Sequence, residues 1–233
     1  MLRIEGANIR QGDFTLSADL SFASNRKYGV IGPSGAGKST LLAAIAGFVP
    51  IQCGRLFWAD HEITEDPPNK RPITMLFQDN NLFPHLSVFQ NVGLGMRPDL
   101  RLDSRQARQV NEALARVGLF DKADQKPGAL SGGQQSRAAL ARVLVQSRPV
   151  ILLDEPFAAL GPALRQDMLE LVEKLSDETE ATVIMVTHMP ADVERMADEV
   201  IFVDAGQAIA AGDARAFLND PPPALSAYLG KER

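Results

Sequence analysis

The sequence predicts an α/β fold whose core is a mostly parallel β-sheet. Two observations support this fold: several short apolar runs lack period-2 alternation, and polar residues follow each run at once. The first is typical of strands buried on both faces of a parallel sheet. The second is typical of a ligand site at the carboxyl edge of such a sheet. The runs are residues 28–31, 73–77, 150–153 and 182–186.

The segments towards the two ends of the chain predict an antiparallel β subdomain. Three of them have the composition of short strands, and a fourth, followed by Ala205 and Gly206, indicates a hairpin. These segments are residues 2–4, 16–22, 56–58 and 200–204.

The middle of the chain has apolar residues at helical spacing, most clearly over residues 104–117 and 134–146. We therefore expect one domain over residues 1–233 that contains a helical insert. The expected parts are a core of residues 1–83 and 149–233, which includes the antiparallel β subdomain, and a helical subdomain of residues 84–148.

Composition excludes several classes of protein. Apolar residues make up 45% of the 233 residues and charged residues 23%, the balance of a globular domain. The net charge of −5 argues against a nucleic-acid partner, which requires a clustered basic face. The single cysteine, Cys53, cannot form an internal disulfide, which favours a reducing compartment. We find no secretory signal and no apolar stretch of the roughly 18 residues that a spanning helix needs, so any membrane role would depend on a partner.

A glycine-rich motif follows the first apolar run. Residues 32–39 read GPSGAGKS, a complete G-x-x-x-x-G-K-S pattern, and a helical run follows. Glycines let backbone amides and the helix N-terminus surround phosphates, Lys38 adds charge at the β- and γ-phosphates, and the Ser39 hydroxyl is placed for Mg²⁺. A turn without a ligand is the alternative, but the flanking strand and helix favour a nucleotide. The expected phosphate contacts are Gly32, Pro33, Ser34, Gly35, Ala36, Gly37, Lys38, Ser39 and Thr40.

Polar residues also end the other core strands. Asp154 and Glu155 follow the third run, where Asp154 suits Mg²⁺ and Glu155 could polarise an attacking water. Gln78 and His188 end the second and fourth runs, so Gln78 could contact the metal or the water and His188 the γ-phosphate. The alternative is a solvated loop for the acid pair and ordinary polar caps for the other two. Their shared position at strand ends favours a site.

A second helix start has the chemistry of an anion site. Residues 130–134 read LSGGQ, and Ser131 with Gln134 three residues later has capping-box spacing. Gly132 and Gly133 then fall in the first turn, where amides without neighbouring side chains can face an anion. A well-capped helix without a ligand would have the same sequence.

These motifs, in this order, resemble the ABC ATPase family, and the resemblance covers essentially the whole chain. The family resemblance implies a P-loop NTPase fold, ATP hydrolysis with Mg²⁺, and a head-to-tail dimer of two copies. Residues 32–40 of one copy and the LSGGQ of the other would hold each ATP, the second set being Ser131, Gly132, Gly133 and Gln134. The resemblance further assigns Mg²⁺ to Ser39, Gln78 and Asp154. It makes Glu155 the general base and sets His188 at the γ-phosphate.

A narrower resemblance concerns residues 70–94, which look like importer ATPases in which residues 78–89 form the groove for a transmembrane permease. The sequences RPITMLFQDNNLFPHLSVFQNVGLGM and FAALGPALRQDML resemble the ATP-binding subunits of bacterial thiamine importers most closely. Such a subunit lies peripherally on the cytoplasmic face of the inner membrane and serves a periplasmic solute-binding protein indirectly. An importer ATPase for another small solute, and a soluble ABC ATPase without a transport role, are the alternatives.

Two residues depart from the family pattern. Gln11 occupies the position near which an aromatic residue usually stacks on adenine, although Phe14 follows closely. Gly161 stands where the loop after Glu155 usually ends in aspartate. These departures raise the alternative of a nucleotide-binding module that no longer hydrolyses ATP, which Lys38 and Glu155 argue against.

Overall fold

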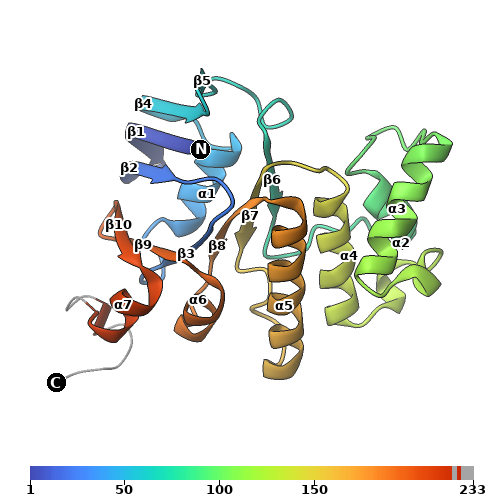
Figure 1. Ribbon diagram of the computed structural model, residues 1–233. Helices are drawn as coiled ribbons and strands as arrows, with labels where there is room; N and C mark the ends of the chain where they lie inside the picture. The colour runs from blue at the N-terminus through green and yellow to red at the C-terminus, as the bar shows by residue number, and fades with distance from the viewer. Residues whose placement is uncertain (222–224, 227–233) are drawn as a thin grey trace.

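One ten-stranded sheet runs through the structure, a computed structural model that describes residues 1–221 and 225–226 (Figure 1). The strand order across the sheet is β5-β4-β1-β2-β10-β9-β3-β8-β7-β6. The strands are β1 (Leu2–Gln11), β2 (Phe14–Phe22), β3 (Lys27–Ile31), β4 (Ile51–Trp58), β5 (His61–Glu62), β6 (Ile73–Leu76), β7 (Val150–Asp154), β8 (Thr182–Val186), β9 (Glu199–Asp204) and β10 (Gln207–Asp213).

The predicted parallel core is confirmed. Strands β3, β8, β7 and β6 pair in parallel, and β9 joins β3 in the same direction. Every residue of β8 is buried, as are nearly all residues of β3 and β7. Burial on both faces explains why these runs show no alternation.

The antiparallel part is also confirmed, but its strands are longer than predicted. Strand β1 pairs with β2 and β4, and its register shifts between Ile4 and Ala7. Gly6 lies in this irregularity with a φ of 53°, so the apolar alternation is interrupted before it resumes at Ala7. The hairpin of β9 and β10 forms as expected, and β10 adds a parallel pairing to β2 that joins the two parts into one sheet.

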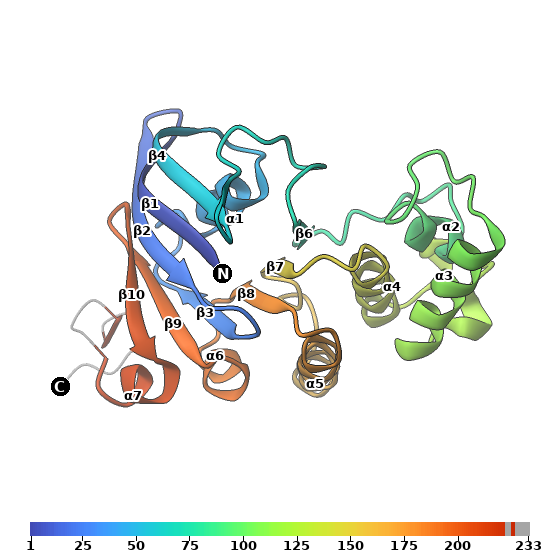
Figure 2. The same ribbon diagram turned by 45° about the horizontal axis from the view of Figure 1, so that its top comes forward.

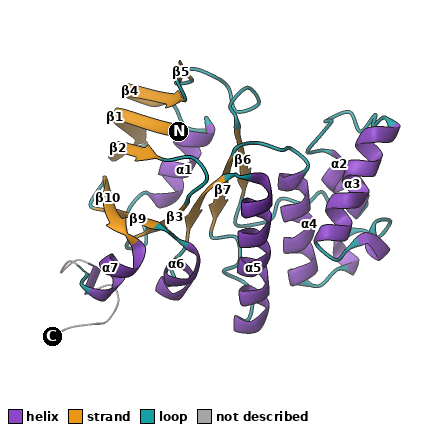
Figure 3. Cartoon of the chain, viewed as in Figure 1, coloured by secondary structure: helices purple, strands orange, loops and turns teal. Residues whose placement is uncertain are grey.

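Helices cover both faces of the sheet (Figures 2 and 3). Helix α1 packs between the antiparallel strands and β6–β7, while α5, α6 and α7 lie on the opposite face. The helices are α1 (Lys38–Ala46), α2 (Val88–Gly93), α3 (Ser104–Arg116), α4 (Gly132–Leu144), α5 (Pro162–Thr179), α6 (Pro190–Met196) and α7 (Ala214–Asn219), with 3₁₀ turns at Phe120–Lys122 and Pro127–Ala129.

The helices between β6 and β7 share a hydrophobic cluster of their own. Helices α2, α3 and α4 pack on one another and contribute Val88, Val110, Leu114 and Ala138 to it. Helix α4 begins earlier than the periodicity indicated, because Ser131 caps it. The boundaries of 84–148 for a helical subdomain stay a prediction. Residues 222–224 and 227–233 of the predicted core lie outside the described residues.

No helix in the described part of the chain combines the length and the apolar character that crossing a bilayer requires. Helix α5, the longest at 18 residues, carries charged residues along its exposed face.

Arg71 fixes the C-terminal end of α1, and hence the helix that follows the glycine-rich motif. Its guanidinium is 3% exposed and donates hydrogen bonds of 2.7–2.8 Å to the carbonyls of Ala44, Ile45, Thr64 and Asp66. A cation at this end also complements the helix dipole.

We expect Arg71→Met to reduce the free energy of unfolding by about 3 kcal/mol, because buried carbonyls would lose their donor. For a domain of this size the loss corresponds to a fall in Tm of roughly 6–12 °C. Thermal unfolding monitored by circular dichroism measures it, with the exposed Arg105→Met as the control. Equal Tm values for the two variants would show that the carbonyls find other donors.

Candidate functional site

The loop between β3 and α1 has the backbone of a phosphate cradle. Gly32 has a φ of 151°, and a Cβ there would come within 1.9 Å of the Val203 carbonyl oxygen. Gly37 has a φ of 106°, and a Cβ there would strike the ring of Phe14. Gly37 is also the N-cap of α1 and provides no side-chain cap, so the first amides of the helix have no side-chain partner at that position. The loop therefore presents N–H groups to an anion.

Lys38 lies across this loop. Its ammonium is 7% exposed and donates hydrogen bonds of 2.8 Å to the carbonyls of Gly32 and Pro33. Burial lowers the pKa of Lys38, while Glu155 and Asp154 oppose that shift. Two of the three ammonium donors thus orient the group, and the third can serve a phosphate oxygen.

Ser39 connects the loop to the acid pair at the end of β7. Its hydroxyl donates to Asp154 Oδ1 over 2.9 Å. Burial raises the pKa of Asp154, and the bond from Ser39 opposes that shift. A hydroxyl and a carboxylate at this separation form an all-oxygen donor set that fits a hard cation such as Mg²⁺. The described residues contain no group of three His, Cys, Asp or Glu placed to hold a metal ion.

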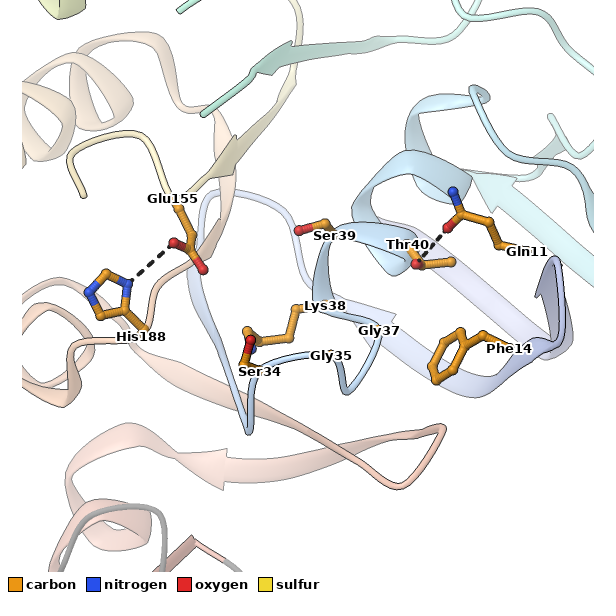
Figure 4. Close-up of a pocket in the computed structure, with 10 residues that line it drawn as sticks. All are labelled: Gln11, Phe14, Ser34, Gly35, Gly37, Lys38, Ser39, Thr40, Glu155 and His188. Atoms are coloured by element: carbon orange, nitrogen blue, oxygen red, sulfur yellow. Dashed lines mark hydrogen bonds and ion pairs between the residues drawn. The ribbon is translucent and has the colours of Figure 1, made fainter. Parts of the chain in front are cut away.

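Glu155 and His188 face each other at one end of the cavity, where a dashed line joins them (Figure 4). The Oε2 of Glu155 lies 3.3 Å from Nδ1 of His188. Glu155 has a φ of 44°, a left-handed conformation that is uncommon for this residue type, and its amide donates to Val186 O over 3.0 Å. Because such strain persists only where the surroundings impose it, this turn is a candidate catalytic position.

One cavity of about 610 Å³ is lined by Lys38, Ser39 and the Glu155–His188 pair, but not by Asp154. Its volume is within the usual range for small-molecule sites. Phe14 and Gln11 lie at the end away from His188 (Figure 4). The Gln11 side chain accepts a 3.0 Å hydrogen bond from the Thr40 hydroxyl. The cavity is lined by Gln11, Phe14, Ser34, Gly35, Gly37, Lys38, Ser39, Thr40, Glu155 and His188.

Some predicted residues lie outside this lining. Gln78 follows β6 and is exposed, but it is not among the lining residues. Ser131 caps α4 by the predicted capping box, accepting from Gln134 N while Gln134 accepts from Ser131 N. Gly132 is open to solvent, whereas a Cβ on Gly133 would strike Leu164, so Gly133 is required for packing within the chain.

A buried polar network beside His188 escaped the sequence analysis. Asp192 is 6% exposed and accepts from Arg165 Nε at 3.0 Å and from the Thr187 hydroxyl at 2.8 Å. The same hydroxyl accepts from Met189 N at 3.1 Å, so the residues on both sides of His188 are fixed. An aspartate in the first turn of a helix is ordinarily a solvated end charge, and the sequence carried no signal of its burial.

Comparisons with known proteins show which family this chain belongs to. Residues 16–158 match the family described as ABC transporter. The thiamine import ATP-binding protein ThiQ of Ruegeria sp. is 54% identical, over 99% of this chain and all of that one. ThiQ of Cereibacter sphaeroides is also 54% identical, with the same coverage, and ThiQ of Brucella suis is 47% identical over 100% and 97%.

Solved structures show the same fold. The cbiO1 protein of Clostridium perfringens, part of the ABC transporter complex cbiONQ, superposes with a TM-score of 0.83 at 29% identity, covering 94% of this chain and 90% of that one. The ATP-binding cassette MJ0796, in a dimeric post-hydrolysis state with ADP and Pi, gives a TM-score of 0.78 at 28% identity, covering 91% and 98%.

The raised pKa of Asp154 predicts how stability depends on pH. Because burial favours the protonated form, the stabilising contribution is complete below the ordinary aspartate pKa and is lost as pH rises through the raised value. We therefore expect Asp154→Asn to have a higher Tm than the unsubstituted protein at neutral pH, in buffer with EDTA and no nucleotide. The difference should shrink as pH falls through the raised pKa, whereas the exposed Asp13→Asn should show no such trend. A lower Tm for Asp154→Asn at neutral pH would contradict the assignment.

Proposed function

Because this chain belongs to the ABC transporter family of ATP-binding subunits, we propose that it is the ATP-hydrolysing motor of a thiamine importer. The observation that carries the hydrolytic part is the single cavity that brings together the Lys38 ammonium, the Ser39 hydroxyl and the Glu155–His188 pair. The thiamine part rests on relatives about half identical over their whole length, which are named as thiamine import proteins.

The chemistry follows from where the groups lie along the cavity. The amides of residues 32–37 and Lys38 bind the phosphates of ATP, and the adenine ring extends towards Phe14 and Gln11. Glu155 takes a proton from the attacking water, and His188 holds the γ-phosphate oxygens as charge develops. Ser39, Asp154 and Gln78 would hold Mg²⁺. The bound ion would neutralise negative charge on the β- and γ-phosphates.

Two copies of the chain complete the site. The LSGGQ turn starts α4 with Ser131 and Gly132 exposed, yet neither lines the cavity of its own chain. A head-to-tail dimer would bring this helix start over the ATP of the second copy, where its first-turn amides bind the γ-phosphate. This arrangement supports the role proposed for Ser131, Gly132, Gly133 and Gln134.

Residues 78–89 would dock a transmembrane permease. Asn91 is fully buried and organises this segment: its Oδ1 accepts from Phe83 N, and its amide donates to the carbonyls of Phe83, Leu86 and Ser87. Phe83 is 46% exposed, and Phe48, which is 54% exposed, lies against Phe77 with the two ring planes tilted by 56°. Exposed aromatic residues on a rigid loop are typical of a protein interface. The subunit would then lie at the cytoplasmic face of the inner membrane, with a periplasmic solute-binding protein contacting only the permease.

We expect Glu155→Gln to reduce the rate of ATP hydrolysis by at least about 10²-fold, because the general base is lost. The same variant should form a stable dimer with ATP and Mg²⁺, since binding remains while turnover stops. Phosphate release and light scattering after size exclusion measure the two effects.

A second substitution in the Glu155→Gln protein tests the LSGGQ contact. Ser131→Asp keeps a good helix cap but sets a negative charge against the γ-phosphate, so the ATP-dependent dimer should be lost while the Tm of the monomer stays the same. Asp103→Ser, an exchange in the capping box of α3, is the matched control and should leave the dimer intact. A dimer that survives Ser131→Asp would refute the head-to-tail arrangement.

Uptake measurements in cells test whether thiamine is the transported solute. Deletion of the gene for this chain in its own host should abolish high-affinity uptake of labelled thiamine, and the unsubstituted gene should restore it where Glu155→Gln does not. Retained thiamine uptake would refute the thiamine assignment without affecting the ATPase, whose activity is measured on the purified protein.

A further inference from the structure

An arginine of α4 holds the loop that follows Gln78. Arg142 donates from Nη1 to the Asn81 carbonyl and from Nη2 to the Asn80 carbonyl, both over 2.7 Å. The two ends of one planar guanidinium therefore bind two consecutive carbonyls in a fixed geometry.

The loop adopts an unusual backbone at the point where it is held. Asn80 and Asn81 both have left-handed conformations, with φ values of 57° and 46°. Asparagine tolerates this region better than most residues, but two in succession need external support. The turn directs both carbonyls towards α4, where Arg142 has no ion-pair partner among residues 1–221 and 225–226. The carbonyls are thus the acceptors that offset the partial burial of this cation.

A second contact joins the same loop to the beginning of α4. Asn80 Nδ2 donates to the Ser136 hydroxyl over 3.3 Å, and that hydroxyl donates to the Gly132 carbonyl over 3.2 Å. Ser136 is 2% exposed. Gly132 follows the helix cap directly, so the loop contacts α4 both near its LSGGQ start and two turns further along.

We propose that Arg142 is a positioning residue that makes the loop after Gln78 and helix α4 move as one body. The inference rests on the proposed function, in which Gln78 serves the ATP of its own chain while the α4 start serves the ATP of the second copy. A shift of Gln78 when one site fills is then carried to the LSGGQ turn at the other site. Arg142 thereby couples the two ATP sites of the dimer.

Steady-state hydrolysis tests this coupling. The unsubstituted protein should show a Hill coefficient for ATP between 1 and the two-site limit of about 2. In Arg142→Met the Hill coefficient should fall to about 1 and kcat should drop about fivefold to tenfold. Arg142→Lys keeps the cation but not the fixed, planar pair of donors, so its values should lie between those two.

A matched variant separates coupling from a general loss of structure. Arg108→Met removes an exposed arginine from α3 and should change neither the Hill coefficient nor kcat. Circular dichroism and the Tm identify any variant that fails to fold, and Arg142→Lys then carries the test.

Two results would overturn the proposal: a Hill coefficient of 1 in the unsubstituted protein, or a folded Arg142→Met protein whose Hill coefficient and kcat match those of Arg108→Met. The ATP-dependent dimer of Glu155→Gln distinguishes this failure from failure of the proposed function. If that dimer forms, and still forms when Arg142→Met is added, the proposed head-to-tail dimer is correct and only the proposed coupling is wrong.

Discussion

The site depends on the partial removal of opposite charges from water at one edge of the parallel sheet. Burial lowers the pKa of Lys38 and raises the pKa of Asp154, so for each group the surroundings disfavour the charged form. Backbone carbonyls hold the ammonium and the Ser39 hydroxyl holds the carboxylate, which offsets part of that cost. A ligand with both negative oxygens and a divalent cation would complement the two groups together. The protein without ligand therefore carries an electrostatic free-energy cost at Lys38 and Asp154, and such a ligand would reduce it.

The His188 loop is held in place by contacts with α5. Asp192 accepts two hydrogen bonds that tie the His188 loop to the first turn of α5. Separating Arg165 from Asp192 would leave an uncompensated buried charge, so breaking this link costs free energy. The orientation of His188 towards Glu155 thus depends on the bonds that tie the His188 loop to α5.

Sequence reasoning identified the elements whose signals are local. The parallel strands were predictable because burial on both faces leaves continuous apolar runs, and the capping box of α4 because Ser131 and Gln134 are three residues apart. The full length of β1 was missed because Gly6 interrupts its alternation. Helices α2, α6 and α7 have six or seven residues each, so their stability comes from tertiary packing that periodicity does not record.

The same distinction holds for the site. The glycine-rich loop, the acid pair and His188 were found because each directly follows a strand. The bond between Gln11 and Thr40 spans 29 residues and those of Arg142 span about 60, so no sequence pattern indicated either contact.

The first turn of α5 links the LSGGQ start of α4 to the His188 loop. It begins after Gly161, which provides no side-chain cap, and Pro162 presets the backbone instead. Within this turn Leu164 packs against Gly133 of the LSGGQ turn, while Arg165 binds Asp192 beside the His188 loop. The start of α4 is therefore held on one side by α5 and on the other by the loop after Gln78. Because both neighbours lead back to strand ends at the same edge of the sheet, a ligand bound there can shift the LSGGQ turn through rigid elements, without any unfolding of the helices between them.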